Sequence, residues 1–303
     1  MIVADLSDQA LAHALGGPGL RLRTGPVVSA VRSKIGSVAS GIRLHYAQHA
    51  LVEPDAFADF HIEIHAGRGV RRLIRPQAWF RFEGSVSFHP LPFDQAFPMF
   101  EWGLNWCISS YCHQFVIIHA GVVARDGRAV VFPAPPGSGK STLCAALMLR
   151  GWRLLSDELA LIDPATHTIT PIPRPIGLKN ASIDVVRTFS CDAIIGPAID
   201  ETAKGTVAHL KPLLASVVSG AELATPAFIV FPAYRPGAPM KMTPVGKADA
   251  FMRLVDNAFN YDIHGRRAFE TLANVVDACR CLEFSYASLD EAITAFDAMF
   301  RDR

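Results

Sequence analysis

The sequence predicts an α/β protein with a mixed sheet, and three observations carry that prediction. Half of the 303 residues are hydrophobic and 19% are charged, a balance typical of globular chains and not of disordered or fibrous ones. Short apolar runs alternate with segments of helical periodicity in the second half. A tight turn at Asp126-Gly127 joins two of those runs, which makes them antiparallel, so we do not expect a simply doubly wound sheet.

Charge and cysteine usage exclude several classes of protein. Lys and Arg total 29 against 28 Asp and Glu, so no overall field favours nucleic acid or an anionic membrane. The six cysteines form no C-x-x-C pair, which argues against a zinc ribbon and a disulfide framework. The N-terminus lacks the pattern of a signal peptide, and no run of about 18 apolar residues occurs. We therefore predict a cytoplasmic protein with no membrane span and no nucleic-acid partner.

The first hundred residues show the period-two pattern of strands. Apolar and polar residues alternate in HIEIHA (61–66) and AWFRF (78–82), which predicts a β-rich unit. Prolines then interrupt the chain, and helical spacing runs from about Gln95 to Cys112. We expect a smaller N-terminal domain of unknown role over residues 1–93 and a second domain over 94–303. Four arginines, Arg68, Arg71, Arg72 and Arg75, are interpreted as a solvated face.

The second domain is predicted to hold strands, hairpins and helices in alternation. A strand at 115–123 turns at Asp126-Gly127 into a return strand at 128–132, and a glycine-containing loop and a helix follow. Gly151 ends that helix and a short strand covers 152–155. The remaining predicted elements are a hairpin of 159–162 with 168–170, an extended proline loop at 171–175, a strand at 227–232, helices within 247–260 and 266–279, a strand at 281–286 and a C-terminal helix.

The strongest chemical signal is the run APPGSGKST at residues 134–142, between a strand and a helix. Small residues let backbone N–H groups turn toward phosphate oxygens, a lysine supplies a point charge for the β- and γ-phosphates, and a Ser or Thr hydroxyl binds Mg²⁺. The pattern predicts a phosphate-binding loop of the Walker A type. Ala134 stands where the usual pattern has its first glycine. The expected nucleotide-binding residues are Pro136, Gly137, Ser138, Gly139, Lys140, Ser141 and Thr142.

An acidic pair, Asp157-Glu158, follows the strand after that helix. Carboxylates beside a phosphate loop suit Mg²⁺ coordination and acceptance of a proton from an attacking hydroxyl. A solvated turn between two strands is the competing interpretation, because acidic turn residues are common. We predict Ser141, Asp157 and Glu158 as metal ligands and Asp157 as the catalytic base.

The run from Ile117 to Asp163 resembles the catalytic core of HPr kinase/phosphorylase, a bacterial protein-serine kinase. The matching features are His119-Ala120-Gly121 on a strand, the hairpin, the loop through Lys140-Ser141, the helix and the acidic pair. The resemblance implies the nucleotide-binding fold that this family shares with phosphoenolpyruvate carboxykinase. Over most of the chain the sequence is similar to the HprK-related kinase A group, through EWGLNW, IHAGVV, SDE, PRPIGLKN and GTVAHLKP.

The resemblance implies roles for single residues. It assigns Asp157 to the seryl hydroxyl, Ser141 to Mg²⁺ and Lys140 to the phosphates, while Glu158 stands where the family has a second Asp. The family's downstream glycine-rich signature, with its metal-binding Glu and an Arg, has no clear counterpart, and the nearest segment is PRPIGLKN (173–180). The resemblance therefore does not by itself imply phosphorolysis or HPr recognition for this chain, and whether reverse phosphorolysis occurs stays open. Relatives form oligomers, which leaves a homo-oligomer open.

The leading hypothesis is an ATP- and Mg²⁺-dependent kinase that phosphorylates a hydroxyl, most simply a serine of a protein or peptide acceptor. His119 is a candidate for contacting phosphate or the hydroxyl, and Arg174 or Lys179 for offsetting charge on the transferred group. Two alternatives stay open: a kinase acting on a sugar or lipid-linked small molecule, and a non-catalytic switch that binds ATP. The residues do not distinguish ATP from GTP.

Overall fold

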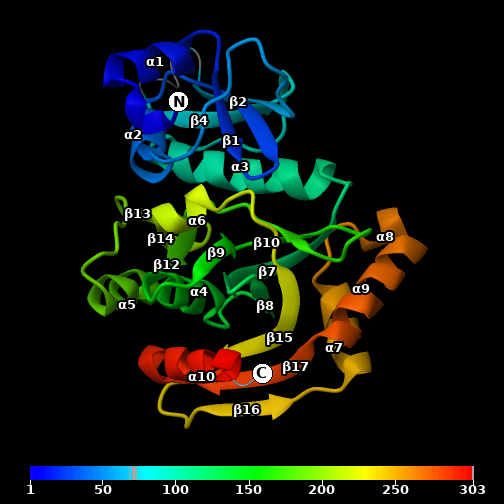
Figure 1. The fold of residues 1–303 in the computed structure, drawn as a ribbon. Helices are drawn as coiled ribbons and strands as arrows, with labels where there is room; N and C mark the ends of the chain where they lie inside the picture. Colours follow the sequence, from blue (N-terminus) through cyan, green and yellow to red (C-terminus); the bar gives the residue numbers. More distant parts are fainter. Residues whose placement is uncertain (68, 70–73, 302–303) are drawn as a thin grey trace.

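The structure is a computed structural model that describes residues 1–67, 69 and 74–301. An N-terminal sheet with its helices lies at one end of the molecule, and a large mixed sheet with helices on both faces forms the other end (Figure 1). The α/β prediction with a mixed sheet is confirmed. Three members of the arginine cluster, Arg68, Arg71 and Arg72, lie outside the described residues.

The described elements follow one another along the chain as two short 3₁₀ helices, ten α-helices and seventeen strands. In order they are η1 Val3–Asp5, α1 Asp8–Gly16, β1 Leu20–Thr24, β2 Val27–Ser33, α2 Gly36–His45, β3 Phe60–Ala66, β4 Gln77–Phe82, β5 Ser85–Val86, β6 Leu91–Pro92, η3 Phe93–Gln95, α3 Ala96–Tyr111, β7 Val116–Arg125, β8 Arg128–Pro133, α4 Lys140–Leu149, β9 Arg153–Ser156, β10 Leu159–Ile162, β11 Ile169–Thr170, β12 Ile176–Lys179, α5 Ala181–Phe189, β13 Ile199–Thr202, β14 Gly205–Leu210, α6 Leu214–Val218, β15 Thr225–Tyr234, β16 Lys241–Pro244, α7 Lys247–Asp256, α8 Tyr261–His264, α9 Arg266–Ala278, β17 Arg280–Tyr286 and α10 Leu289–Arg301.

The N-terminal sheet has the order β1-β2-β3-β4-β5, with β6 beside β4. Strands β2 and β3 are parallel and the other pairs are antiparallel, because α2 forms the crossover between them. Helix α3 packs on this sheet, and Phe80, Phe100 and Leu104 share one buried core. Helices α1 and α2 were not among the predicted elements, although Ser7 caps α1 by accepting from the N–H of Ala10. The division at residue 93 stays a prediction.

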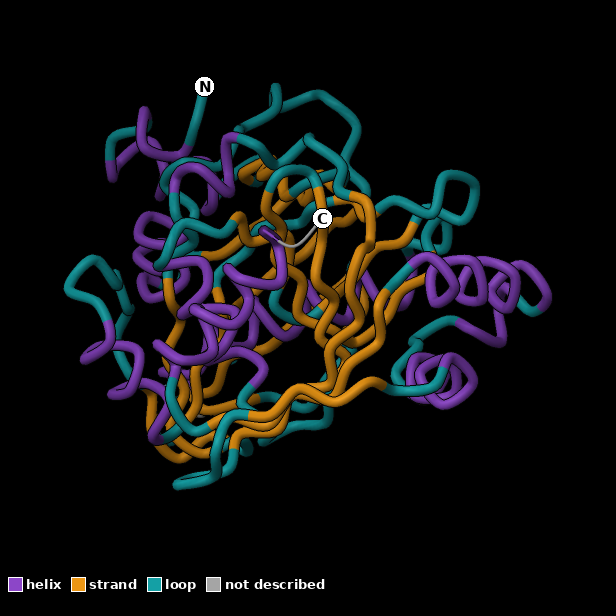
Figure 2. The backbone as a smooth tube through the Cα atoms, turned by 60° about the horizontal axis from the view of Figure 1, so that its bottom comes forward, coloured by secondary structure: helices purple, strands orange, loops and turns teal. Residues whose placement is uncertain are grey.

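The large sheet has the order β11-β10-β7-β8-β15-β17-β16, with β9 beside β7. Strands β7 and β8 form the predicted antiparallel hairpin, while β15 lies parallel to both β8 and β17. Helices lie on both sides of these strands (Figure 2). The mixed character follows from the turn at Asp126 and Gly127, where a two-residue connection leaves no room for a crossover.

Side chains on the central strands alternate between two buried cores. Val130 and Phe132 pack with α4 and α10 on one face, whereas Val131 and Ile229 pack with α7 and α9 on the other. This arrangement explains why β8 is an unbroken apolar run in the sequence, since helices cover both faces of the sheet. Strand β8 ends at Pro133 and leads directly into residues 134–139, so the sheet fixes where that loop begins.

A small sheet of order β12-β14-β13 lies beside α4 and α5. The proline loop at 171–175 leads into β12, whose Ile176 and Leu178 join the core that holds α4. The N–H of Gly177 on β12 bonds to Asp157, so this sheet lies next to the end of β9.

Over the described part of the chain, no helix has both the length and the apolar character needed to cross a bilayer.

Candidate functional site

The glycine loop at 134–139 has a backbone that needs glycine at two positions. Gly137 and Gly139 adopt φ values of +86° and +87°, in the left-handed region that side chains disfavour. Ala134 is not among the residues with positive φ, so alanine in place of the usual first glycine imposes no backbone strain. Gly139 immediately precedes the first residue of α4, so the loop lies at the N-terminus of this helix. Free N–H groups and the helix dipole stabilise negative charge there.

Lys140 and His119 meet Glu158 beside this loop. Lys140 Nζ lies 3.0 Å from His119 Nε2, which lies 2.8 Å from Glu158 Oε2, and Lys140 Nζ is 4.0 Å from the same carboxylate oxygen. One ring nitrogen cannot accept from Lys140 and donate to Glu158 at once, so the two contacts need different tautomers of His119. The turn between β9 and β10 produces this meeting, because Leu159 pairs with His119 across β10 and β7.

Gly121 on β7 makes room for the lysine. A Cβ atom at this position would lie 2.5 Å from Cys144 Sγ and 3.2 Å from Lys140 Cγ. The helix and the lysine stem therefore approach the strand more closely than any other residue would allow. Our sequence reasoning assigned no role to this glycine, although a glycine within an apolar strand is a signal of close approach.

Asp157 is buried at the end of β9, and one of its carboxylate oxygens has no partner. The N–H of Gly177 donates to Oδ2 at 3.2 Å, whereas Oδ1 has no hydrogen-bonding partner among the described residues. Burial, with a smaller contribution from the Glu158 carboxylate, raises the pKa of Asp157 to about 7. Lys140, the Ser141 hydroxyl and Gly177 oppose that rise. A carboxylate with a pKa near neutrality is suited to accept and release a proton.

Glu158 has the opposite electrostatic character. Burial alone would raise its pKa, but the contact with His119 and the charge of Lys140 outweigh burial and lower it. Lys179 on β12 adds to this lowering. The pKa of Lys204, which follows β13, is lowered as well. Burial is the largest cause, the charge of Lys179 adds to the decrease, and the charge of Glu158 opposes it. Three lysines, Lys140, Lys179 and Lys204, thus interact electrostatically with Glu158.

Arg174 is not brought to this cluster. Its guanidinium donates to Glu101 Oε2 at 2.7 Å and to Asn105 Oδ1 at 2.6 Å, both on α3. Because the buried Arg174 is used in these contacts, the structure does not place it where it was expected, beside the phosphates. Of the two cations predicted to offset charge, Lys179 is the one whose charge lowers the pKa of Glu158.

Three further residues around the loop were missed by the sequence analysis. Tyr286, at the end of β17, donates its hydroxyl to the carbonyl of Gly139 at 3.0 Å. The ring of Phe259 lies 5.8 Å from the ring of His119. Lys204 rests over the ring of Trp102 at 4.9 Å. All three come from segments far from the loop in sequence, so no local pattern could have assigned them to it.

The oxygen atoms of Asp157 and Ser141, beside the glycine loop, fit a magnesium ion. Mg²⁺ takes oxygen ligands and is usually held by one or two carboxylates together with substrate phosphates and water. The unpartnered Oδ1 of buried Asp157 and the nearby Ser141 hydroxyl are donors of this kind. Over the described residues, no group of three or more His, Cys, Asp or Glu side chains is placed to hold a metal unaided. The residues therefore fit an ion that arrives with a phosphate ligand.

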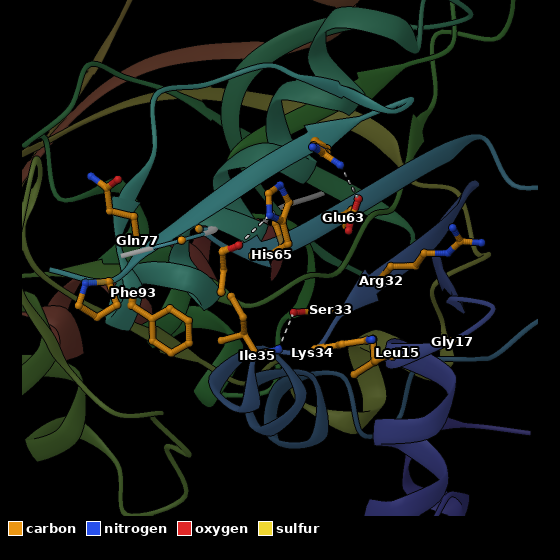
Figure 3. A pocket seen from close by; sticks show the side chains of 17 residues that line it. Leu15, Gly17, Arg32, Ser33, Lys34, Ile35, Glu63, His65, Gln77 and Phe93 are labelled. Atoms are coloured by element: carbon orange, nitrogen blue, oxygen red, sulfur yellow. Dashed lines mark hydrogen bonds and ion pairs between the residues drawn. The ribbon is translucent and has the colours of Figure 1, made fainter. Parts of the chain in front are cut away.

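A cavity of about 790 Å³ lies elsewhere, in the N-terminal part (Figure 3). Lys34, Glu63, His65 and Gln77 are among its lining residues, and none of the predicted site residues is. The side chains have mixed charge, and Arg81 pairs with Glu63 at 3.6 Å. The cavity is thus separate from the glycine loop and its acidic pair.

No protein-family model and no curated protein matches the sequence. Among solved structures, the HPr(Ser) kinase/phosphatase from Coxiella burnetii is similar to this chain, with 11% sequence identity and a TM-score of 0.26. The match covers 62% of this chain and 99% of that one. At this TM-score the likeness is weak and carries no argument about function. Membership of the HPr kinase family stays a prediction from the sequence.

Proposed function

We propose that the protein is a kinase that transfers the γ-phosphoryl group of ATP to a hydroxyl, with a serine of a protein or peptide as acceptor. The observation that carries the proposal is Asp157, a buried carboxylate with a raised pKa and one unpartnered oxygen, next to Ser141 and Lys140 at the glycine loop. A solvated turn, the competing interpretation of the acidic pair, does not fit a side chain that is 4% exposed.

Each residue has a distinct part in the proposed transfer. The loop N–H groups and Lys140 bind the phosphates, and Lys179 with Lys204 offsets charge on the transferred group. Ser141 and Asp157 would hold Mg²⁺, which when bound neutralises phosphate charge. Asp157 takes the proton of the acceptor hydroxyl, the hydroxyl oxygen bonds to the γ-phosphorus, and the bond from that phosphorus to the bridging oxygen breaks to release ADP.

His119 and Glu158 keep Lys140 in place in this proposal. Lys140 is buried, and its ammonium group has Glu158 at 4.0 Å and His119 at 3.0 Å. A buried cation needs such partners, because an unpaired charge in the interior is costly. Phosphate oxygens can take over the contact with the ammonium group, which leaves His119 Nε2 to donate its hydrogen to Glu158.

The test uses purified protein with γ-labelled ATP, Mg²⁺ and dialysed host lysate, beside a Lys140→Ala variant. A labelled protein band that is absent with Lys140→Ala is the expected result and identifies the acceptor. Label that appears only when the small-molecule fraction is restored would replace the acceptor by a small molecule. Binding of ATP without transfer or phosphate release would contradict the kinase and leave a switch. A cytoplasmic location and a homo-oligomeric state stay predictions beside it.

A further inference from the structure

The proline loop at 171–175 has few means of holding itself in place. Prolines 171, 173 and 175 have no N–H group, so they cannot donate to neighbouring backbone. The N–H of Ile172 donates to the carbonyl of Leu155 at 2.7 Å, and the Ile172 side chain is buried in the N-terminal core. Residues 173–175 must therefore be fixed by contacts other than their own backbone donors.

Helix α3, which packs on the N-terminal sheet, supplies those contacts through a buried ion pair. Arg174 donates to Glu101 Oε2 at 2.7 Å, and Tyr46 donates its hydroxyl to Glu101 Oε1 at 2.7 Å. His49 Nε2 lies 2.8 Å from the carbonyl of Pro173, so it is the donor there. Glu101 and Arg174 are 3% and 7% exposed. Since each carboxylate oxygen of Glu101 is bonded, the pair is fully satisfied and held in one arrangement.

The same loop ends at the donor that holds the proposed base. Gly177 follows Arg174 by three residues, at the start of β12, and its N–H donates to Asp157 Oδ2. Oδ1, the other oxygen of this carboxylate, has no partner among the described residues. The position of the Asp157 oxygens therefore depends on where residue 177 lies, which the proline loop before it and its pairing with His209 on β14 fix together.

We propose that the Glu101–Arg174 ion pair positions Asp157 for phosphoryl transfer, acting through the proline loop and the Gly177 N–H. The proposal rests on the proposed function, because it assumes that Asp157 is the base. Glu101 and Arg174 are positioning residues: neither touches the glycine loop. Helix α3 thereby takes part in the reaction without carrying a reacting group.

A pair that only stabilises the fold would show different behaviour. Loss of stability lowers the fraction of folded protein and leaves each folded molecule unchanged, whereas a misplaced base lowers kcat of every molecule with little effect on KM for ATP. The phosphate-binding residues lie on another segment, so we expect nucleotide binding to survive loss of the pair. The two roles are therefore separable by kinetics on folded protein.

The experiment uses the full chain with both charges removed, Glu101→Gln together with Arg174→Met. Removing both partners leaves no uncompensated buried charge, which favours a folded variant, and circular dichroism with a melting curve checks this. The matched control is Asp297→Asn, which removes the partly buried Arg125–Asp297 pair in the core around α10. Kinetics of ATP turnover with Mg²⁺ and dialysed host lysate as the source of acceptor gives kcat and KM, and spectra of ¹⁵N-glycine-labelled protein give the Gly177 amide signal, assigned through Gly177→Ala.

The expected result is a kcat about 10- to 100-fold lower at unchanged KM, as for a reacting group displaced by a fraction of an ångström to an ångström. The Gly177 amide should shift and exchange faster with solvent, as it should in Asp157→Asn, while Asp297→Asn leaves both readouts unchanged. A folded double variant with wild-type kcat, or with an unmoved Gly177 signal, overturns the proposal. Absence of ATP turnover in the wild type would instead contradict the proposed function, and the Gly177 signal would still show whether the ion pair governs this contact.

Discussion

Two ionic clusters, one around Arg174 and one around Lys140, differ in how completely the oxygens of their carboxylates are hydrogen-bonded. Around Arg174, both oxygens of Glu101 are bonded. Around Lys140, an oxygen of Asp157 has no partner among the described residues, and one nitrogen of His119 faces two groups. We call the cluster of Arg174 and Glu101 the closed cluster, because its hydrogen bonds are complete and hold one structure. We call the cluster of Lys140, His119, Asp157 and Glu158 the open cluster, because it keeps bonding capacity for a ligand. The difference explains why Arg174, despite its charge, is the poorer candidate for binding phosphate.

The largest effect should come from the open cluster. Asp157→Asn keeps the shape of the side chain and removes the proposed base, so we expect transfer to fall by about 10³-fold while ATP affinity changes little. Labelled-phosphate transfer and nucleotide titration measure the two quantities. The control is Asp163→Asn, in the turn after β10, where the carboxylate accepts only from local N–H groups. Wild-type transfer by Asp157→Asn would remove Asp157 as the base.

Substitutions in the closed cluster should change the free energy of unfolding. Glu101→Gln alone leaves Arg174 buried without its counter-charge, which we expect to lower the free energy of unfolding by about 3 kcal/mol. Urea denaturation measures this loss. The double variant Glu101→Gln with Arg174→Met should recover most of it, because no buried charge then lacks a partner. Equal losses in the single and double variants would show that the bonds to Tyr46 and Asn105, rather than charge, dominate the cluster.

Much of the fold follows from local patterns, and the parts that do not are informative. The hairpin at Asp126-Gly127, the helix from Lys140 and the strand ending at Ser156 were predicted because each has a turn or cap signal beside an apolar run. Helix α2 was missed since its sequence, GSVASGIRLH, has glycines and serines that favour loops when isolated. Packing against α3 outweighs that preference.

The candidate site was predictable only where its residues are close in sequence. The loop and the acidic pair flank one helix, and the structure brings Lys140, His119, Asp157 and Glu158 together. The role of Arg174 depended on the path of a proline loop, which no periodic pattern describes. A cation near a phosphate loop in sequence is equally able to pair with a carboxylate on another element, and Glu101 is such a carboxylate.

Acid should lower the free energy of unfolding through three buried histidines near the closed cluster. Burial, the largest cause in each case, lowers the pKa of His45 and His49 to about 4 and of His209 to about 3, from 6.5. Between these values the unfolded chain binds protons that the folded chain does not, so the free energy of unfolding falls as the pH drops from 6.5 toward 4. Each histidine contributes up to about 1.4 kcal/mol per pH unit. Urea denaturation at about pH 7, 6 and 5 measures the slope.

The open cluster contributes to that slope with the opposite sign. The pKa of Asp157 is raised, so the folded chain binds the extra proton and gains stability as the pH falls through about 7 toward 3.8. The acid slope should therefore be steeper in Asp157→Asn and shallower in His209→Gln. A slope that neither substitution changes would show that these buried groups do not control the acid response.

The smallest expected effects concern the two glycines of the loop. Gly137→Ala meets no atom within 4 Å, so only its positive φ disfavours alanine, at a cost of about 1 kcal/mol. Gly139→Ala carries the same strain, and its Cβ would also lie 2.5 Å from the Tyr286 hydroxyl and 2.9 Å from Tyr234 Cβ. Nucleotide titration should give a larger loss of ATP affinity for Gly139→Ala. Equal losses would show that backbone strain alone matters.

The parallel pairing of β8 with β15 has a consequence for how the site is made in the cell. These strands are separated by about 100 residues, and at about 5–20 residues per second the ribosome needs roughly 5 to 20 seconds to synthesise that stretch. The carbonyl of Gly139 gains its bond from the Tyr286 hydroxyl later still, because Tyr286 lies on β17, which is synthesised after β15. A nascent chain therefore carries the glycine loop without its final supports, and nucleotide binding should begin only after the last strand has left the ribosome.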